Sequence, residues 1–162
     1  MTHNDLLRRI RYILDLSDSN VIAIFGLANQ PVTRAQICNW LKTEEDADYQ
    51  PLKDQMLASF LNGLIVDKRG QREGERPKPE KRLSNNMIFM KLKIALNLKT
   101  EDILAILALN NFPLSKHELS AFFRKQDHKH YRLCKDQVLR NFLKGLQLRY
   151  RGKTEMTVQF QW

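Results

Sequence analysis

The sequence predicts a mainly α-helical protein that contains two copies of one module of roughly 70 residues. First, residues 4–70 align without a gap onto residues 86–152, an offset of 82 positions. The longest match pairs KDQMLASFLNGL at 53–64 with KDQVLRNFLKGL at 135–146. Second, apolar residues recur every three or four positions, as in amphipathic helices. A repeat of this length exceeds a solenoid unit, so we expect two duplicated four-helix modules.

The repeat and the composition together predict the domain boundaries. The first module is expected at 1–70 and the second, with a C-terminal extension, at 84–162. Between them, QREGERPKPEKRL at 71–83 contains one glycine, two prolines and eight charged residues. Such a segment has little apolar surface to bury, so it is predicted to be a linker.

Four helices are expected in the second module. The first spans 86–98, and the second begins near Thr100 and ends before Pro113. Ser115 and Glu118 have the spacing of a capping box and predict the start of the third. The fourth is expected at 133–144, followed by Gly145 as a helix terminator. Two aromatic pairs that recur between the copies, Trp40 with Phe122 and Phe60 with Phe142, are predicted to lie in the cores.

Two arrangements remain open for the end of each module. Apolar and polar residues alternate in LQLRYRGKTEMTVQFQW at 146–162, which is typical of a β-hairpin, and LIVDKRGQREG occupies the same place in the first copy. A short hairpin there would make each module similar to a winged helix-turn-helix domain, with the fourth helix as its recognition helix. The alternative is a four-helix bundle without a hairpin.

The net charge of +9 is concentrated in the second copy. Residues 1–70 carry 8 basic and 9 acidic residues, whereas residues 84–152 carry 13 and 5. A localised basic face is the feature expected for binding a phosphate backbone, so we expect nucleic acid as the partner. The possible recognition helix and wing, with Arg149 and Arg151 on the wing, favour duplex DNA. The alternative is that the charge only maintains solubility. The residues predicted to contact nucleic acid are Lys129, Arg132, Lys135, Gln137, Arg140, Asn141, Lys144, Arg149 and Arg151.

One aligned segment changes sign between the copies. TEEDADYQ at 43–50 is acidic, and its counterpart KQDHKHYR at 125–132 is basic. This difference suggests a second hypothesis, in which the protein is an interaction adaptor or homo-oligomer that docks its acidic copy against its basic copy. The residues that would carry this protein interaction are Glu44, Glu45, Asp46 and Asp48.

The sequence lacks the motifs of common enzymes and metal sites. Asp127, His128 and His130, with His117 nearby, are the only cluster that resembles metal ligands, and the first copy has no equivalent histidines. No phosphate-binding glycine loop and no GxSxG motif occur. We therefore expect a non-enzymatic protein without a metal, cofactor or small-molecule ligand. Cys38 and Cys134 are expected to be reduced, packed thiols.

No apolar run approaches the roughly 20 residues of a membrane span, and residues 1–15 lack the apolar segment of a signal peptide. A soluble, cytoplasmic protein is expected.

The segments KDQVLRNFLKGL and LSKHELSAFFRK, together with the duplication, resemble the YehS-like family of uncharacterised bacterial proteins, which have two copies of domain of unknown function 1456. The resemblance covers nearly the whole chain and implies a bacterial cytoplasmic protein, but no activity, cofactor or catalytic residue.

Overall fold

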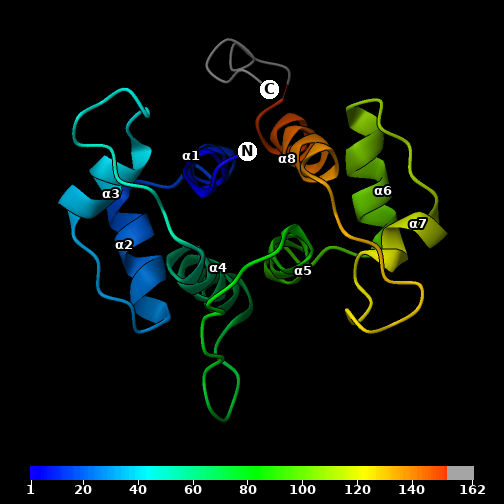
Figure 1. Ribbon diagram of the computed structural model, residues 1–162, viewed down its shortest axis with the longest axis horizontal. Helices are drawn as coiled ribbons and strands as arrows, with labels where there is room; N and C mark the ends of the chain where they lie inside the picture. The colour runs from blue at the N-terminus through cyan, green and yellow to red at the C-terminus, as the bar shows by residue number, and fades with distance from the viewer. Residues whose placement is uncertain (153–162) are drawn as a thin grey trace. The chain divides into compact units, whose positions relative to one another are not determined.

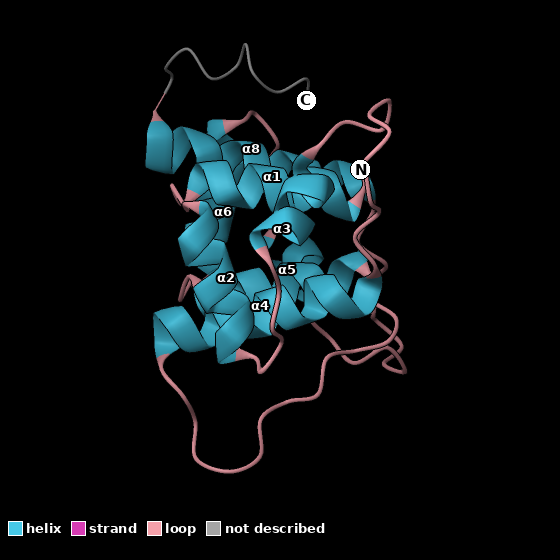
Figure 2. Ribbon diagram, turned by 90° about the vertical axis from the view of Figure 1, so that its left-hand side faces the viewer, coloured by secondary structure: helices cyan, strands magenta, loops and turns pink. Residues whose placement is uncertain are grey.

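The computed structural model describes residues 1–152 as eight α-helices joined by loops (Figure 1). No strand occurs within this range (Figure 2). The helices are α1 (His3–Ile13), α2 (Asp18–Leu27), α3 (Arg34–Leu41), α4 (Asp54–Arg69), α5 (Asn85–Ala95), α6 (Thr100–Leu109), α7 (Lys116–Ala121) and α8 (Asp136–Arg151). The contacts define a first unit, residues 1–83 with 91–97, and a second unit that includes residues 84–90 and the described residues from 98 onward, so this division falls within α5.

Side chains that precede the helices determine where several helices begin. Thr2, Ser17, Thr33 and Ser115 each accept a hydrogen bond from the backbone N–H three residues later, and the side chain at that later position bonds back to the cap. These reciprocal bonds satisfy N–H groups that have no partner within the helix. The capping box predicted at Ser115 and Glu118 is confirmed, at 3.0 and 3.1 Å.

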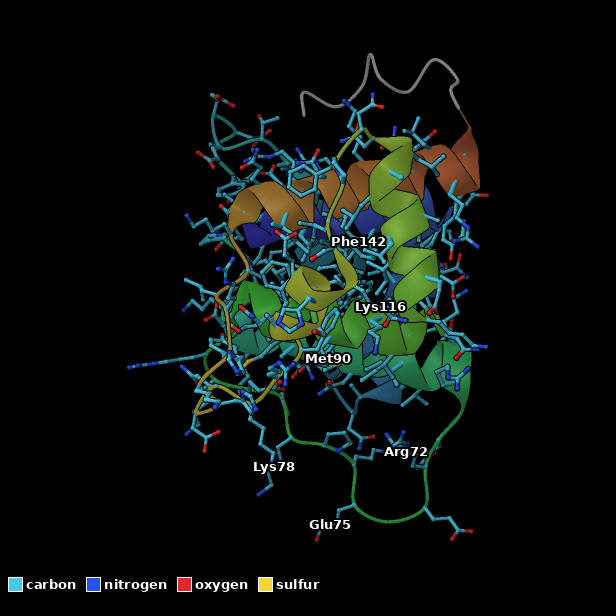
Figure 3. The ribbon with its side chains drawn as sticks, turned by 90° about the vertical axis from the view of Figure 1, so that its right-hand side faces the viewer. Arg72, Glu75, Lys78, Met90, Lys116 and Phe142 are labelled. Carbon is cyan, nitrogen blue, oxygen red and sulfur yellow. The ribbon has the colours of Figure 1, made fainter. Side chains whose placement is uncertain are left out.

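Each unit has an aromatic core in which one phenylalanine lies close to the two recurring aromatic positions, but this phenylalanine comes from α2 in the first unit and from α5 in the second. In the first, the Phe25 ring lies 5.6 Å from Trp40 and 5.3 Å from Phe60, measured between centroids. In the second, the Phe89 ring lies 6.4 Å from Phe122 and 4.6 Å from Phe142, which is labelled on α8 in Figure 3. All of these side chains are buried. The predicted packing role of the recurring aromatic residues is therefore confirmed.

Glycines in the middle of α4 and α8 allow close contact with the neighbouring helix. A Cβ added to Gly63 would overlap the carbonyl oxygen of Ile24 on α2, and a Cβ added to Gly145 would overlap that of Ile106 on α6. In Figure 1, α2 packs against α4, and α6 packs against α8. Glycine at these positions therefore lets two backbones approach.

The predicted hairpins are wrong within the described residues. Helix α4 continues to Arg69 and α8 to Arg151, through the positions assigned to first strands and turns. Gly145 is a packing residue within α8, and the helices end instead at Gly70 and Gly152, whose φ angles are 84° and 75°. Leu146 and Gln147 are buried, so the helical core face extends past Gly145. Residues 153–162, the expected second strand, lie outside the described part.

The segment between the two copies has no helix or strand and is attached to the first unit. The Arg76 guanidinium donates hydrogen bonds to the Leu27 carbonyl at 2.8 Å and to Asn29 Oδ1 at 2.7 Å. The Leu83 N–H donates to Asp54 Oδ2 at 2.9 Å. Glu75, just before the first attachment, and Lys78, between the two, extend away from the helices in Figure 3.

Within residues 1–152, none of the helices combines the length and the apolar character needed to cross a lipid bilayer.

Candidate functional site

The two loops of opposite charge have the same backbone conformation. We call residues 43–50 the acidic loop and residues 125–132 the basic loop. In the acidic loop, the N–H groups of Asp46, Tyr49 and Gln50 donate to the carbonyls of residues 43, 46 and 39. In the basic loop, the equivalent N–H groups donate to the carbonyls of residues 125, 128 and 121. The change in charge therefore leaves the main-chain hydrogen bonds intact.

One side chain inside each loop supports this conformation. The Asp48 N–H donates to Asp46 Oδ1 at 2.9 Å, and the His130 N–H donates to His128 Nδ1 at 3.0 Å. The imidazole of His128 thus accepts the bond that the Asp46 carboxylate accepts in the first unit. This bond occupies Nδ1 of His128, and no group of three or more potential metal ligands occurs in residues 1–152.

A buried asparagine in each unit holds the loop against the helices. The Asn4 amide donates to the carbonyls of Trp40 and Gln50, at 2.9 and 2.8 Å, and its Oδ1 accepts from the Leu52 N–H at 2.9 Å. Asn86 makes the equivalent three bonds in the second unit, with the carbonyls of residues 122 and 132 and the N–H of residue 134, at 3.0, 2.7 and 2.8 Å. Both ends of each loop are therefore tied to one side chain.

The basic loop and α7 together line a cleft of about 320 Å³. Its cationic side chains are Arg124, Lys129 and Arg132, and its one carboxylate is Glu118. Hydrogen bonds with the Ser115 backbone and side chain lower the pKa of Glu118, because they stabilise its ionised form. The lining residues that remain are His117, Ala121, His130 and Tyr131.

The lining of this cleft is more positive than the aligned surface of the first unit. Without the histidines, its charged side chains sum to +2. The eight aligned residues of the first unit include only two charged groups, Lys42 and Asp48, which pair with each other at 3.5 Å. The cleft therefore accounts for two of the nine charges by which the copies differ, and it presents them at one concave site.

Arg124 was not among the predicted site residues, although it lines the cleft. Its Nε is buried, and no hydrogen-bond partner for this atom is present within residues 1–152. Its counterpart Lys42 has the Asp48 carboxylate, but the residue aligned with Asp48 is His130. Comparing pairs of aligned residues, rather than single positions, would have identified Arg124 from the sequence.

The predicted site residues lie on two surfaces. Lys129 and Arg132 are exposed and line the cleft. The prediction placed Arg149 and Arg151 on a wing, but both lie in the last turn of α8. Four predicted residues, Gln137, Arg140, Lys144 and Arg151, fall on one face of α8 because their positions follow helical spacing. Arg140 and Lys144 are half-buried, whereas Lys135, at the N-cap, and Gln137 are exposed.

Asn141 contributes to the structure of the second unit. Its Oδ1 accepts a hydrogen bond from Nδ2 of Asn110, the residue that ends α6, and its own Nδ2 donates to the Gln137 carbonyl at 2.7 Å. Both polar atoms of the amide therefore make a hydrogen bond inside the unit, which fixes the orientation of this side chain.

The acidic loop lines a smaller cleft of about 190 Å³. Glu44 and Glu45 face it, together with Tyr49, whose pKa is raised by burial and by the Glu44 carboxylate. Arg8 donates to the carbonyls of residues 41 and 42 and to the Asp5 carboxylate, at 3.4, 3.2 and 2.9 Å. Met90 is aligned with Arg8, so the basic loop lacks this attachment.

Both cysteines are free thiols, but only one of them is packed. Cys134 is buried, and burial raises the pKa of its thiol to about 12. Cys38 is exposed on α3, so the prediction of a packed thiol is wrong for this residue.

Comparison with known proteins identifies the family. The family model "Protein of unknown function (DUF1456)" matches residues 3–70 and again residues 85–152. Over 154 residues the chain is 46% identical to the "Uncharacterized protein YehS" of Escherichia coli (strain K12), with 94% of this chain and 99% of that protein covered. No solved structure matches the chain. Both copies of the duplicated module match the family model, and the chain belongs to the DUF1456 family.

Proposed function

We propose that this protein is a non-enzymatic, cytoplasmic protein that binds nucleic acid through the basic surface of its second unit. The observation that supports the proposal best is the cleft with three cationic side chains, Arg124, Lys129 and Arg132, at a place where the first unit has a neutral, internally paired surface. Two free cysteines are compatible with a reducing compartment.

The exposed side chains around the cleft extend the positive surface. Lys125, directly after Arg124, and Lys135, three residues after Arg132, are exposed. Between them, Leu133 exposes 65% of its surface, so an apolar group lies within this basic segment. Cations beside exposed apolar surface suit a strand of nucleic acid, because its phosphates and its bases are then both contacted.

The preference for duplex DNA rested on a recognition helix followed by a wing. Because α8 continues as a helix through Arg149 and Arg151, the described residues provide no such wing. The proposal therefore covers nucleic acid in either form, and the test compares the two.

The test is a fluorescence anisotropy titration of the full chain against random duplex DNA and single-stranded RNA, at about 50 and 200 mM salt. The logarithmic slope is roughly −0.9 per phosphate neutralised on duplex DNA and −0.7 on a single strand. For about four phosphate contacts, duplex affinity should fall roughly 150-fold across this range. Absence of binding to both at 50 mM salt would refute the proposal.

Two variants locate the surface, and each introduces the residues of the first unit. The cleft variant changes Lys129→Ala and Arg132→Gln, and the helix variant changes Arg140→Ala and Lys144→Asn. We expect the cleft variant to lose at least tenfold in affinity. A loss of that size only in the helix variant would place binding on α8 and not on the cleft.

A second candidate function is docking between copies of the chain. It is favoured by the two loops, which have equivalent backbone hydrogen bonds and opposite charge. All four carboxylates of the acidic loop are exposed. Asp48 pairs with Lys42 and Asp46 accepts from the loop backbone, so Glu44 and Glu45 are the residues offered to a basic surface. Reversing Glu44 and Glu45 to lysine should then change the oligomeric state in sedimentation velocity. An unchanged profile would count against this function.

A further inference from the structure

The buried Nε of Arg124 indicates where a ligand group belongs. Buried donors in folded proteins nearly always have an acceptor, and a charged donor loses most without one. Within residues 1–152, no acceptor is present for this atom. Arg124 lines an open cleft together with two further cations, so an anionic group from solution can approach its side chain there. Nε itself is closed off from solvent, and a small movement of the guanidinium would let it share such an acceptor.

The first unit shows what kind of acceptor fits. At the aligned position, Lys42 pairs with the carboxylate of Asp48, an anionic group carried by the loop itself. The second unit has His130 at the place of this carboxylate, on a loop with equivalent backbone hydrogen bonds. The substitution removes the anionic partner at this position. An external anion can therefore take over the pairing role that Asp48 has in the first unit.

The charge and the size of the cleft narrow the identity of this anion. A phosphomonoester carries about −1.5 to −2 charge at pH 7, which matches the +2 of the charged lining, whereas each backbone phosphodiester carries one negative charge. Guanidinium groups bind phosphate oxygens through two parallel hydrogen bonds. The volume of about 320 Å³ lies at the lower end of the range for ligand pockets, enough for one nucleotide but not for a duplex segment.

We infer that this cleft binds the terminal phosphomonoester of a nucleic acid strand, with Arg124 as its central ligand and Lys129 and Arg132 on either side. The inference deepens the proposed function and rests on it for the source of the phosphate. A free mononucleotide has the same phosphate chemistry, and the experiment separates the two sources.

The experiment measures the affinity of the full chain for three fluorescent 12-nucleotide single strands, at about 50 mM salt. The strands share one sequence and end in a 5′-phosphate, a 3′-phosphate or hydroxyls at both ends. A fourth titration uses adenosine 5′-monophosphate, with adenosine as its reference. We expect one phosphorylated strand to bind at least fivefold more tightly than the hydroxyl strand.

His130→Asp is the decisive variant, because the first unit has aspartate at the aligned position in an equivalent loop. The introduced carboxylate should pair with Arg124 as Asp48 pairs with Lys42 and remove the preference for the phosphorylated end. Arg124→Gln should have the same effect by removing the ligand. Ala105→Glu, at an exposed position of α6 outside the cleft, makes the same change in charge and should retain the preference.

The possible outcomes separate this inference from the proposed function. Equal binding of all three strands would overturn the terminal-phosphate inference and leave nucleic-acid binding intact. Binding of adenosine 5′-monophosphate but of no strand would overturn both the nucleic-acid function and a strand as the source of the phosphate. A preference for the phosphorylated end that persists in His130→Asp and Arg124→Gln would overturn the assignment to this cleft.

Discussion

Replacing Asn86 with alanine tests whether one buried side chain maintains the basic loop. Asn86 exposes 6% of its surface and makes three hydrogen bonds to backbone groups, at 3.0, 2.7 and 2.8 Å. The substitution removes all three bonds and leaves two carbonyl groups and one N–H without their partner. These groups belong to segments 36 to 48 residues away in sequence, so α5 would lose the three bonds of Asn86 to both ends of the loop and keep the bond from Asn85 to the Cys134 carbonyl.

The expected loss follows from the number of bonds. A typical intramolecular hydrogen bond contributes about 1 kcal/mol net, and a buried group left unsatisfied costs about 1–3 kcal/mol. Three bonds of this kind therefore predict a loss of about 3 kcal/mol in the free energy of unfolding of the second unit. The true value should not rise far above this figure, because the carbonyl of residue 132 belongs to an exposed residue and water can replace the lost donor there.

Urea denaturation followed by circular dichroism measures this loss, and ligand affinity provides a second readout. Asn4→Ala is the matched control, because it removes the equivalent three bonds in the first unit. Both variants should be destabilised by similar amounts, but only Asn86→Ala should weaken binding at the cleft. A loss below about 1 kcal/mol in both variants would refute the reasoning, because the bonds would then contribute less than one ordinary hydrogen bond.

Three further predictions follow from packing and ionisation. Gly145→Ala should destabilise the protein by about 1–3 kcal/mol in urea denaturation, because the added Cβ overlaps the Ile106 carbonyl. Gly26→Ala is the control and should not destabilise the protein in this way, because nothing lies within 4 Å of its added Cβ. Equal losses in the two variants would contradict the role of Gly145 in helix contact. Cys38 is exposed and should react rapidly with a thiol reagent near pH 8. Cys134 should react only after unfolding, because burial raises the pKa of its thiol to about 12. Two rapidly reacting thiols in the native protein would disprove this expectation. A hydrogen bond of 2.7 Å from the Asn85 amide lowers the pKa of Asp136. The Asp136 carboxylate therefore stabilises the fold fully above its unfolded pKa near 4, and this contribution is lost as the pH falls through the lower folded pKa. Asn85→Ala should raise the folded pKa of Asp136 in an NMR titration, and an unchanged pKa would show that this bond is not the cause.

Features that depend on neighbouring residues in the chain were predictable from the sequence. The capping box of Ser115 and Glu118 forms within four residues, and it is present as expected. The recurring aromatic positions also identified the core, because helical spacing places them on the buried face. The duplication itself was visible from the gapless alignment, and the family matches confirm it.

Features that depend on distant residues were missed. Gly145 looks like a helix terminator when only its neighbours are considered, but its contact with the Ile106 carbonyl lies 39 positions away and can be seen only in the packed unit. For the same reason, the alternation after Gly145 was interpreted as a strand, although the core face of α8 continues beneath it. Asn86 was not singled out, because its three partners belong to other segments.

The candidate site was predicted only in part. Charge counting identified the second copy, and Lys129 and Arg132 do line the cleft. Arg124 was overlooked because its aligned residue, Lys42, is also basic, so the comparison of single positions showed no difference. The informative change is in the partner, where Asp48 is replaced by His130.

The hydrogen bonds of Asn4 and Asn86 have a consequence for how the two copies can diverge. Asn4 and Asn86 lie outside the loops, and their hydrogen bonds to backbone groups hold the two ends of each loop in place. The loop's own side chains therefore need to supply only one acceptor, at the position of Asp46 or His128. The other side chains are then free to change after duplication, much as hypervariable segments change on a constant framework. Transplanting residues 43–50 into positions 125–132 should accordingly give a folded chimera with an altered binding preference, and a library at these positions would turn the module into a display scaffold.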